Sequence, residues 1–242
     1  MNDQTKAAVD AVWAEMFGLS TADFSRDAVH VVADRAMDDV VTVMVDRSCV
    51  VWVPDHLEEA ARDRFSSLSA TEAFTSGPLE QLVSERGEVV GLSWHHYGDQ
   101  EMLRAESDAA VRAVPGDDAA LIEFLEAGSI EDWAESGFPR HPASHTEEVQ
   151  YWIMQEQDRV VAAGNMTPWR GVPADVGVLV GTRDRGRGFA SRLVGAMLAD
   201  CVQTAAIVRY RALSTNAASL AVAQRLGFAR YGGNYLAKLT AV

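Results

Sequence analysis

The segment from Val178 to Ala190 combines glycine and arginine in a pattern suited to binding an anion. Gly186 and Gly188 stand two residues apart, directly before a stretch with helical spacing. Glycine lets backbone N–H groups converge and lets a ligand approach without a Cβ in the way. The unpaired N–H groups and the positive dipole end of a following helix point at the same place. Phosphate or pyrophosphate is the ligand that suits such a loop best.

Three arginines within five residues, Arg183, Arg185 and Arg187, add positive charge to this loop. The chain as a whole is acidic, with 35 Asp and Glu against 21 Lys and Arg and a net charge of −14. The contrast favours an anion site over a merely solvated charged face. An acidic surface repels phosphate backbones, so we expect no nucleic-acid partner.

Two common phosphate loops fit this segment incompletely. The pattern G-x-x-x-x-G-K-[ST] begins at Gly181, but Arg187 and Gly188 stand where Lys and Ser or Thr are needed. The dinucleotide pattern G-x-G-x-x-G has Ser191 in place of its third glycine, and no ribose-binding acid follows the next predicted strand. The pattern [QR]-x-x-G-x-[GA], by contrast, is complete from Arg183 to Gly188.

The hydrophobic periodicity around this loop alternates between strands and helices. It predicts a mixed α/β sheet with helices on both faces in the C-terminal half, residues 106–242. The expected strands are 110–114, 149–155, 159–166, 176–180, 207–212 and 235–239, and the expected helices are 117–126, 130–135, 188–201 and 216–226.

Residues 1–105 have the pattern of a smaller α/β domain. Helices are expected at 5–17 and 56–68, and strands at 29–32, 40–45, 49–53 and 89–97. This half contains no phosphate loop, no nucleophile with a neighbouring base and no metal-ligand spacing. We therefore expect it to be a non-catalytic scaffold, and we predict one domain boundary between residues 105 and 106.

Residues 109–242 resemble the GNAT superfamily of acyl-CoA-dependent N-acyltransferases. Two segments carry the resemblance: the complete loop pattern after the fourth strand of this half, and Asn216-Ala217-Ala218-Ser219 followed by Leu226-Gly227-Phe228. The second segment is similar to the family's N-x-x-S … L-G-F stretch, in which the asparagine and serine face the CoA arm. Residues 1–105 resemble, more weakly, the degenerate N-terminal half of some two-part GNAT proteins.

The resemblance implies an N-acetyltransferase that moves the acetyl group of acetyl-CoA to an amine by direct attack, with no protein nucleophile and no metal. The end of the fourth strand would offer its backbone to the pantetheine, and the glycine loop would hold the pyrophosphate. The implied cofactor-binding residues are Val178, Leu179, Val180, Arg183, Arg185, Gly186, Arg187, Gly188, Phe189, Ala190, Ser191, Asn216 and Ser219.

The acid and the base of this reaction do not follow from the resemblance. The family's usual acid is a tyrosine seven residues after the asparagine, and that position is Ala223 here. Tyr231 and Tyr235 are the candidate acids, although each can equally pack the last strands. Asp175 is the candidate base, with Glu147, Glu148 or a water chain as alternatives. A non-catalytic CoA-binding or sensor protein is the alternative function.

The remaining features indicate a cytoplasmic protein, and the resemblance implies a small-molecule or peptide amine as its partner. The N-terminus lacks the basic start and apolar core of a signal peptide, and no apolar run reaches the ~20 residues that cross a bilayer. Cys49 and Cys201 lie in apolar runs and are expected to be buried. His141 and His145 have ligand spacing, but Pro142 argues against the helix that would align them.

Overall fold

The computed structural model describes residues 1–240 with gaps at 85–86, 130–135, 139–148, 170–171 and 204. The chain forms two compact units and passes between them more than once. One unit, here called the loop unit, contains residues 96–211 and 216–229. The other, here called the terminal unit, contains residues 2–95, 212–215 and 230–242.

The terminal unit is built on most of a six-stranded sheet with the order β1-β3-β2-β10-β4-β9. Strand β1 is parallel to β3, whereas β2 is antiparallel to β3 and to β10. The strands of this sheet are β1 (Ala28–Ala33), β2 (Val40–Val45), β3 (Ser48–Val53), β4 (Gly87–Gly98), β9 (Val208–Leu213) and β10 (Ala229–Leu239). The helices of the terminal unit are α1 (Asp3–Phe17), α2 (Glu58–Phe65), α3 (Ala70–Ala73) and α4 (Ser76–Val83). Short 3-10 turns lie at Thr21–Ser25 and Asp55–Leu57.

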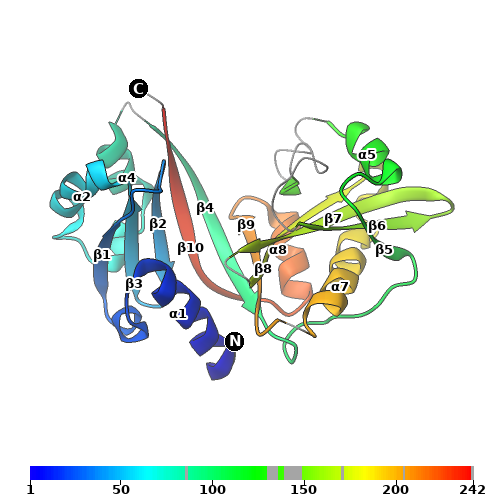
Figure 1. The fold of residues 1–242 in the computed structure, drawn as a ribbon, viewed down its shortest axis with the longest axis horizontal. Helices are drawn as coiled ribbons and strands as arrows, with labels where there is room; N and C mark the ends of the chain where they lie inside the picture. The colour runs from blue at the N-terminus through cyan, green and yellow to red at the C-terminus, as the bar shows by residue number, and fades with distance from the viewer. Residues whose placement is uncertain (85–86, 130–135, 139–148, 170–171, 204, 241–242) are drawn as a thin grey trace. The chain divides into compact units, whose positions relative to one another are not determined.

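Helices cover both faces of this sheet because its β-branched strands are apolar on both sides. Cys49, Val51 and Val53 pack into one core with residues of α2, α3 and α4. On the other face, Trp52 packs edge-on against Phe17 of α1, with ring centroids 5.6 Å apart. Figure 1 shows α2 and α4 on one side of β1–β3 and α1 on the other.

The loop unit contains a four-stranded antiparallel sheet with the order β5-β6-β7-β8. Its elements are β5 (Val111–Val114), α5 (Ala119–Glu126), β6 (Gln150–Glu156), β7 (Arg159–Trp169), β8 (Val172–Val180), a 3-10 turn at Thr182–Asp184, α7 (Phe189–Cys201) and α8 (Ala217–Arg225). Figure 1 shows α5 and α7 on opposite faces of this sheet.

Alternating residues of these strands supply two cores. Leu121 and Leu125 of α5 pack with Ile153 and Leu179 on one face. On the other face α7 lies very close to β7, since a Cβ on Gly164 would stand 2.4 Å from the sulfur of Met197. Glycine at position 164 therefore sets how closely this helix approaches the sheet.

The structure confirms the predicted fold class, a mixed α/β protein with a mixed sheet. Most strands and helices lie close to their predicted ranges, but β8 begins at Val172 and β10 at Ala229, before the expected starts at 176 and 235. Helices α3 and α4 were not predicted, and the helix expected at 130–135 lies outside the described residues. Gln157 and Asp158 have positive φ in the turn between β6 and β7, as a tight hairpin requires. Cys49 and Cys201 are buried, and burial raises the pKa of the Cys49 thiol to about 12.

The division of the chain differs from the single boundary expected at residue 105. Residues 230–242 belong with the N-terminal residues, because β10 pairs with β2 and places Leu236 opposite Val41. Sequence periodicity predicts a strand at the C-terminal end but not its partner. None of the described helices combines the length and apolar character needed to span a bilayer.

We predict that Gly232→Ala lowers the free energy of unfolding by at least about 2 kcal/mol. Gly232 has a φ of +81°, and a Cβ there would stand 2.1 Å from the carbonyl oxygen of Met44. Gly18 is the matched control, since its φ is +64° and a Cβ would meet no atom within 4 Å. Gly18→Ala should cost only about 1 kcal/mol. Equal losses in urea unfolding would contradict the clash at Gly232.

Candidate functional site

The glycine loop connects β8 to α7. Gly186 and Gly188 have φ values of +76° and +83°, which L-residues with side chains rarely adopt. A Cβ at either position would meet no atom within 4 Å, so the space in front of both is open. Helix α7 begins at Phe189, and its first N–H groups have no partner within the helix. Open space, exposed backbone and a helix N-terminus together fit a bound pyrophosphate.

A buried carboxylate holds the first half of this loop. Asp184 is 2% exposed and accepts two hydrogen bonds from Arg159, at 2.6 and 3.0 Å. Arg187 donates to the same carboxylate at 3.1 Å. The hydrogen bonds from Arg159 are the largest influence on the Asp184 carboxyl, and its pKa is lowered although burial acts in the opposite direction.

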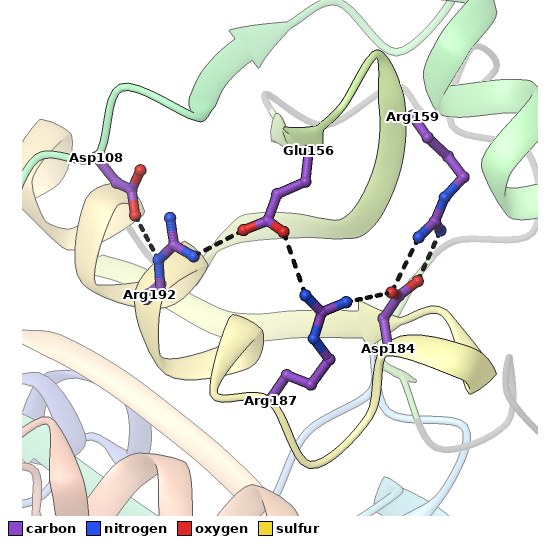
Figure 2. Close-up of polar contacts among 6 residues, drawn as sticks. All are labelled: Asp108, Glu156, Arg159, Asp184, Arg187 and Arg192. Carbon is purple, nitrogen blue, oxygen red and sulfur yellow. Dashed lines mark hydrogen bonds and ion pairs between the residues drawn. The ribbon is translucent and has the colours of Figure 1, made fainter.

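The ion pairs continue from Asp184 across the loop unit. Arg187 also reaches Glu156 at 3.5 Å, and Glu156 accepts from Arg192 of α7 at 3.0 Å. Arg192 in turn pairs with Asp108 at 2.8 Å. Figure 2 shows the resulting row of alternating charges, which runs through Asp108, Arg192, Glu156, Arg187, Asp184 and Arg159. The row ties the loop to α7 and to the β6–β7 hairpin.

The three loop arginines therefore differ in what they can offer a ligand. Arg187 is held by carboxylates and stacks over the Phe189 ring, 4.6 Å from its centroid. Arg185 donates from Nε to the carbonyl oxygen of Val180 at 3.3 Å. Arg183 forms no ion pair or hydrogen bond with another described residue, and it lines a cavity. Among the described residues, Arg183 is thus the one of the three loop arginines without an ion pair or hydrogen bond.

That cavity was not predicted from the sequence. It has a volume of about 600 Å³ and lies beside the loop, between α5, the β6–β7 hairpin and the end of β8. Phe124, Arg159 and Arg183 are among the residues that line it. These residues come from three separate elements, and no local sequence pattern brings them together.

The second motif predicted from the sequence forms the start of α8. The side chain of Asn216 accepts a hydrogen bond from the backbone N–H of Ser219 at 2.9 Å, as an N-cap does. The hydroxyl of Ser219 lies 2.8 Å from the hydroxyl of Tyr210 on β9, which is fully buried. Sequence reasoning missed Tyr210, because one tyrosine between two strand arginines carries no signal of its own.

A family model for the acetyltransferase (GNAT) domain matches residues 90–229, more than half of the chain. The chain belongs to the GNAT acetyltransferase family. The matched residues include the glycine loop, the bulged strand β8 and the start of α8. The match does not extend over residues 1–89, so the likeness of the N-terminal half to a degenerate GNAT half stays a prediction.

Two solved structures with TM-scores above 0.5 show the same fold. A protein of the GNAT family from Novosphingobium aromaticivorans superposes with a TM-score of 0.51 at 16% identity, over 65% of this chain and 69% of that one. A conserved protein of unknown function from Staphylococcus epidermidis gives 0.51 at 11% identity, over 69% of each chain. A GNAT-family acetyltransferase from Colwellia psychrerythraea gives 0.49 at 13%, over 69% and 63%. A comparison with curated protein sequences finds no match.

The other predicted cofactor-binding residues of this GNAT chain lie on β8 and at the start of α7. Leu179 and Phe189 are buried, Val178, Val180 and Ala190 are half-buried, and Ser191 accepts a hydrogen bond from Arg225 at 2.8 Å. Strand β8 is the last strand in the order of its sheet. No described strand of that sheet therefore pairs with its outer backbone edge.

Asp175, the candidate base, lies at a β-bulge in β8. It has a φ of +46°, at the point where the register between β7 and β8 shifts. One carboxylate oxygen accepts from Arg209 at 2.8 Å, and the other lies 3.4 Å from Arg211. Guanidinium groups thus engage both oxygens, which is unfavourable for taking a proton from an amine. The alternatives Glu147 and Glu148 lie outside the described residues.

The candidate acids, Tyr231 and Tyr235, both belong to the terminal unit. The Tyr231 hydroxyl donates to the carboxylate of Asp10 in α1. The ring of Tyr235 packs against that of Phe74, with centroids 5.4 Å apart. Each side chain therefore has a structural role within its unit, and a role as the acid stays a prediction. Among the described residues, no group of three or more His, Cys, Asp or Glu could hold a metal ion.

We predict that Asp184→Asn destabilises the protein in a pH-dependent way. The pKa of Asp184 is lowered in the folded state, so its carboxylate contributes stability above the ordinary value near 3.8, and this contribution is lost as the pH falls through the folded pKa. The difference in unfolding free energy between wild type and variant should therefore be largest at pH 7 and shrink below about pH 4. Urea unfolding at pH 7, 5, 4 and 3 measures it.

Asp158→Asn is the control, because Asp158 forms no ion pair with a described residue and asparagine tolerates its positive φ of 61°. The free energy of unfolding of this variant should remain within about 0.5 kcal/mol of that of wild type at all of these pH values. A deficit in Asp184→Asn that stayed constant down to pH 3 would show that the charge of Asp184 is not what holds the loop.

Proposed function

We propose that the chain is a cytoplasmic N-acetyltransferase that moves the acetyl group of acetyl-CoA to the amine of a small molecule or peptide. The observation that carries the proposal is the open space in front of Gly186 and Gly188, at the start of α7. No protein atom near these glycines would block an anion there, and the family of the chain supports an acyl-CoA as the source of that anion.

Different residues in and near the loop would bind different parts of the donor. The backbone N–H groups of Gly186 to Ala190 would bind the pyrophosphate, with Arg183 adding charge from the side of the cavity. Asp184 would act indirectly, by holding Arg187 against the loop. The outer edge of β8, around Val178 and Val180, would pair with the amides of the pantetheine.

The reaction then depends more on the alignment of donor and acceptor than on a reactive side chain of the protein. When bound, acetyl-CoA supplies an activated acetyl group that an amine can attack directly. An aligned donor and acceptor gain rate because the encounter no longer costs translational and rotational entropy. The amine must arrive deprotonated, and a proton must reach the leaving thiolate. Tyr231 and Tyr235 are the proposed acids and Asp175 the proposed base.

A non-catalytic CoA-binding protein is the second candidate function. Two observations favour it: Ala223 stands at the position of the family's usual acid, and Asp175 is engaged by two arginines. Such a protein would bind acetyl-CoA without releasing its thiol. Thiol release against a panel of amines therefore separates the two functions.

We predict that Gly188→Glu abolishes the binding of CoA measured by calorimetry. The variant places a side chain and a negative charge in the open space that the pyrophosphate would occupy. Gly18→Glu is matched in backbone conformation and in open surroundings but lies at the end of α1. It should bind CoA like wild type. CoA binding that survived in Gly188→Glu would refute the proposed donor site.

Replacing the acid by phenylalanine should lower kcat at least about tenfold. Tyr231→Phe and Tyr235→Phe test the two proposed acids separately. Tyr231→Phe should also cost about 1 kcal/mol of stability, because Asp10 loses a hydrogen-bond donor. Kinetics at saturating acetyl-CoA and thermal unfolding measure both effects. If kcat is unchanged in both variants, neither tyrosine is the acid and solvent protonates the thiolate.

A further inference from the structure

Two guanidinium groups and one carboxylate meet at the bulge of β8. Arg209 and Arg211 are two residues apart on β9, so their side chains emerge on the same face of the strand. Arg209 pairs with Asp175 at 2.8 Å, and Arg211 pairs with it at 3.4 Å. The formal charges are +1, +1 and −1, which leaves one positive charge unbalanced within this group.

The position of Arg209 makes this excess charge unusual. Its side chain is 5% exposed and lies over the ring of Trp169, 3.8 Å from the centroid. Burial lowers the pKa of Arg209, and the neighbouring Asp175 opposes that effect. A guanidinium nevertheless keeps its proton in proteins, so the buried charge persists.

Arg209 also has a hydrogen-bond donor that the described residues leave unused. Its Nε is buried and has no acceptor among them. A buried donor without a partner destabilises the folded state, and more so when it is charged. An anion at this place would therefore offset both an unmet hydrogen bond and an unbalanced charge.

The cluster is too far from the glycine loop to serve the pyrophosphate. Asp175 and Gly181 are six residues apart on an extended strand, which corresponds to roughly 20 Å at about 3.3 Å per residue. Strand β8 thus has an anion loop at one end and a separate positive cluster near the other. A donor held by the loop and lying along β8 would point its acetyl end toward the cluster.

We infer that Arg209 and Arg211 bind a carboxylate of the acceptor, so that the substrates are amines that carry a carboxylate, as amino acids and peptides do. The inference rests on the proposed function, because it names the acceptor of that same site. One excess positive charge balances one carboxylate, whereas a phosphate group carries −1.5 to −2. The planar fork of arginine also matches a carboxylate geometrically.

The test compares the binding of N-acetylated α-amino acids with that of their primary amides, by calorimetry on the full chain. The two members of each pair differ in one negative charge. We expect at least one acid to bind at least tenfold more tightly than its amide. Arg211→Ala should reduce that preference to less than twofold. Arg211 is 45% exposed, so its removal should leave the fold intact.

Arg112→Ala is the matched control. Arg112 is 48% exposed and forms one ion pair of 3.3 Å, with Asp118, in the same unit. This variant should keep the full preference for the acid. A general loss of positive charge would instead weaken binding equally in both variants, and that result would overturn the inference.

CoA binding measured on the same proteins separates this inference from the proposed function. If every acid and its amide bind alike while CoA binds and some amine is acetylated, the carboxylate site is wrong and the acetyltransferase stands. If an acid binds through Arg211 while CoA does not bind, the carboxylate site stands and the donor site is wrong. A preference for the acid that survives in Arg211→Ala also overturns the inference.

Discussion

The pairing of one buried carboxylate with two arginines is the interaction on which the rest of the candidate site depends. A loop that presents bare N–H groups to an anion has few side chains with which to stabilise itself. Asp184 stabilises the loop by accepting hydrogen bonds from Arg159 on β7 and from Arg187 within the loop. The carboxylate is 2% exposed, whereas the side chains of Arg159 and Arg187 are 59% and 54% exposed, so solvent reaches these contacts from the arginine side. The glycines can therefore stay open without the loop losing its shape.

The same arrangement explains how a chain with a net charge of −14 can hold an anion. Glu156 and Asp108 neutralise Arg187 and Arg192. Arg183 is left out of this row, and the backbone carries the remaining positive potential. The positive potential at the loop thus comes from the backbone and from Arg183, although Glu123 and Asp158 line the same cavity as Arg183. At the bulge of β8 the balance is different, since two arginines there share a single acid.

Local features of the site could be predicted from the sequence, and long-range ones could not. The loop pattern from Arg183 to Gly188 is continuous in the chain, so its conformation follows from glycine, strand and helix signals alone. Asp175 and Arg209 are 34 residues apart in the chain, and they form an ion pair at the bulge in β8. No periodicity records the bulge or the ion pair, which is why Asp175 was named a candidate base without its arginine partners. Arg159, Tyr210 and the cavity beside α5 were missed for the same reason.

Strand β10 has a consequence for how the protein is made. It lies between β2 and β4 in the sheet of the terminal unit. The strand near position 40 therefore gains its second neighbour only when the residues near position 235 have been added to the chain. On a ribosome the N-terminal strands emerge long before their partner has been synthesised. The edge of β2 is then an apolar, unpaired strand for most of translation, a state prone to association with other chains. Chaperone dependence during synthesis should therefore be set by the terminal unit, not by the unit that carries the glycine loop.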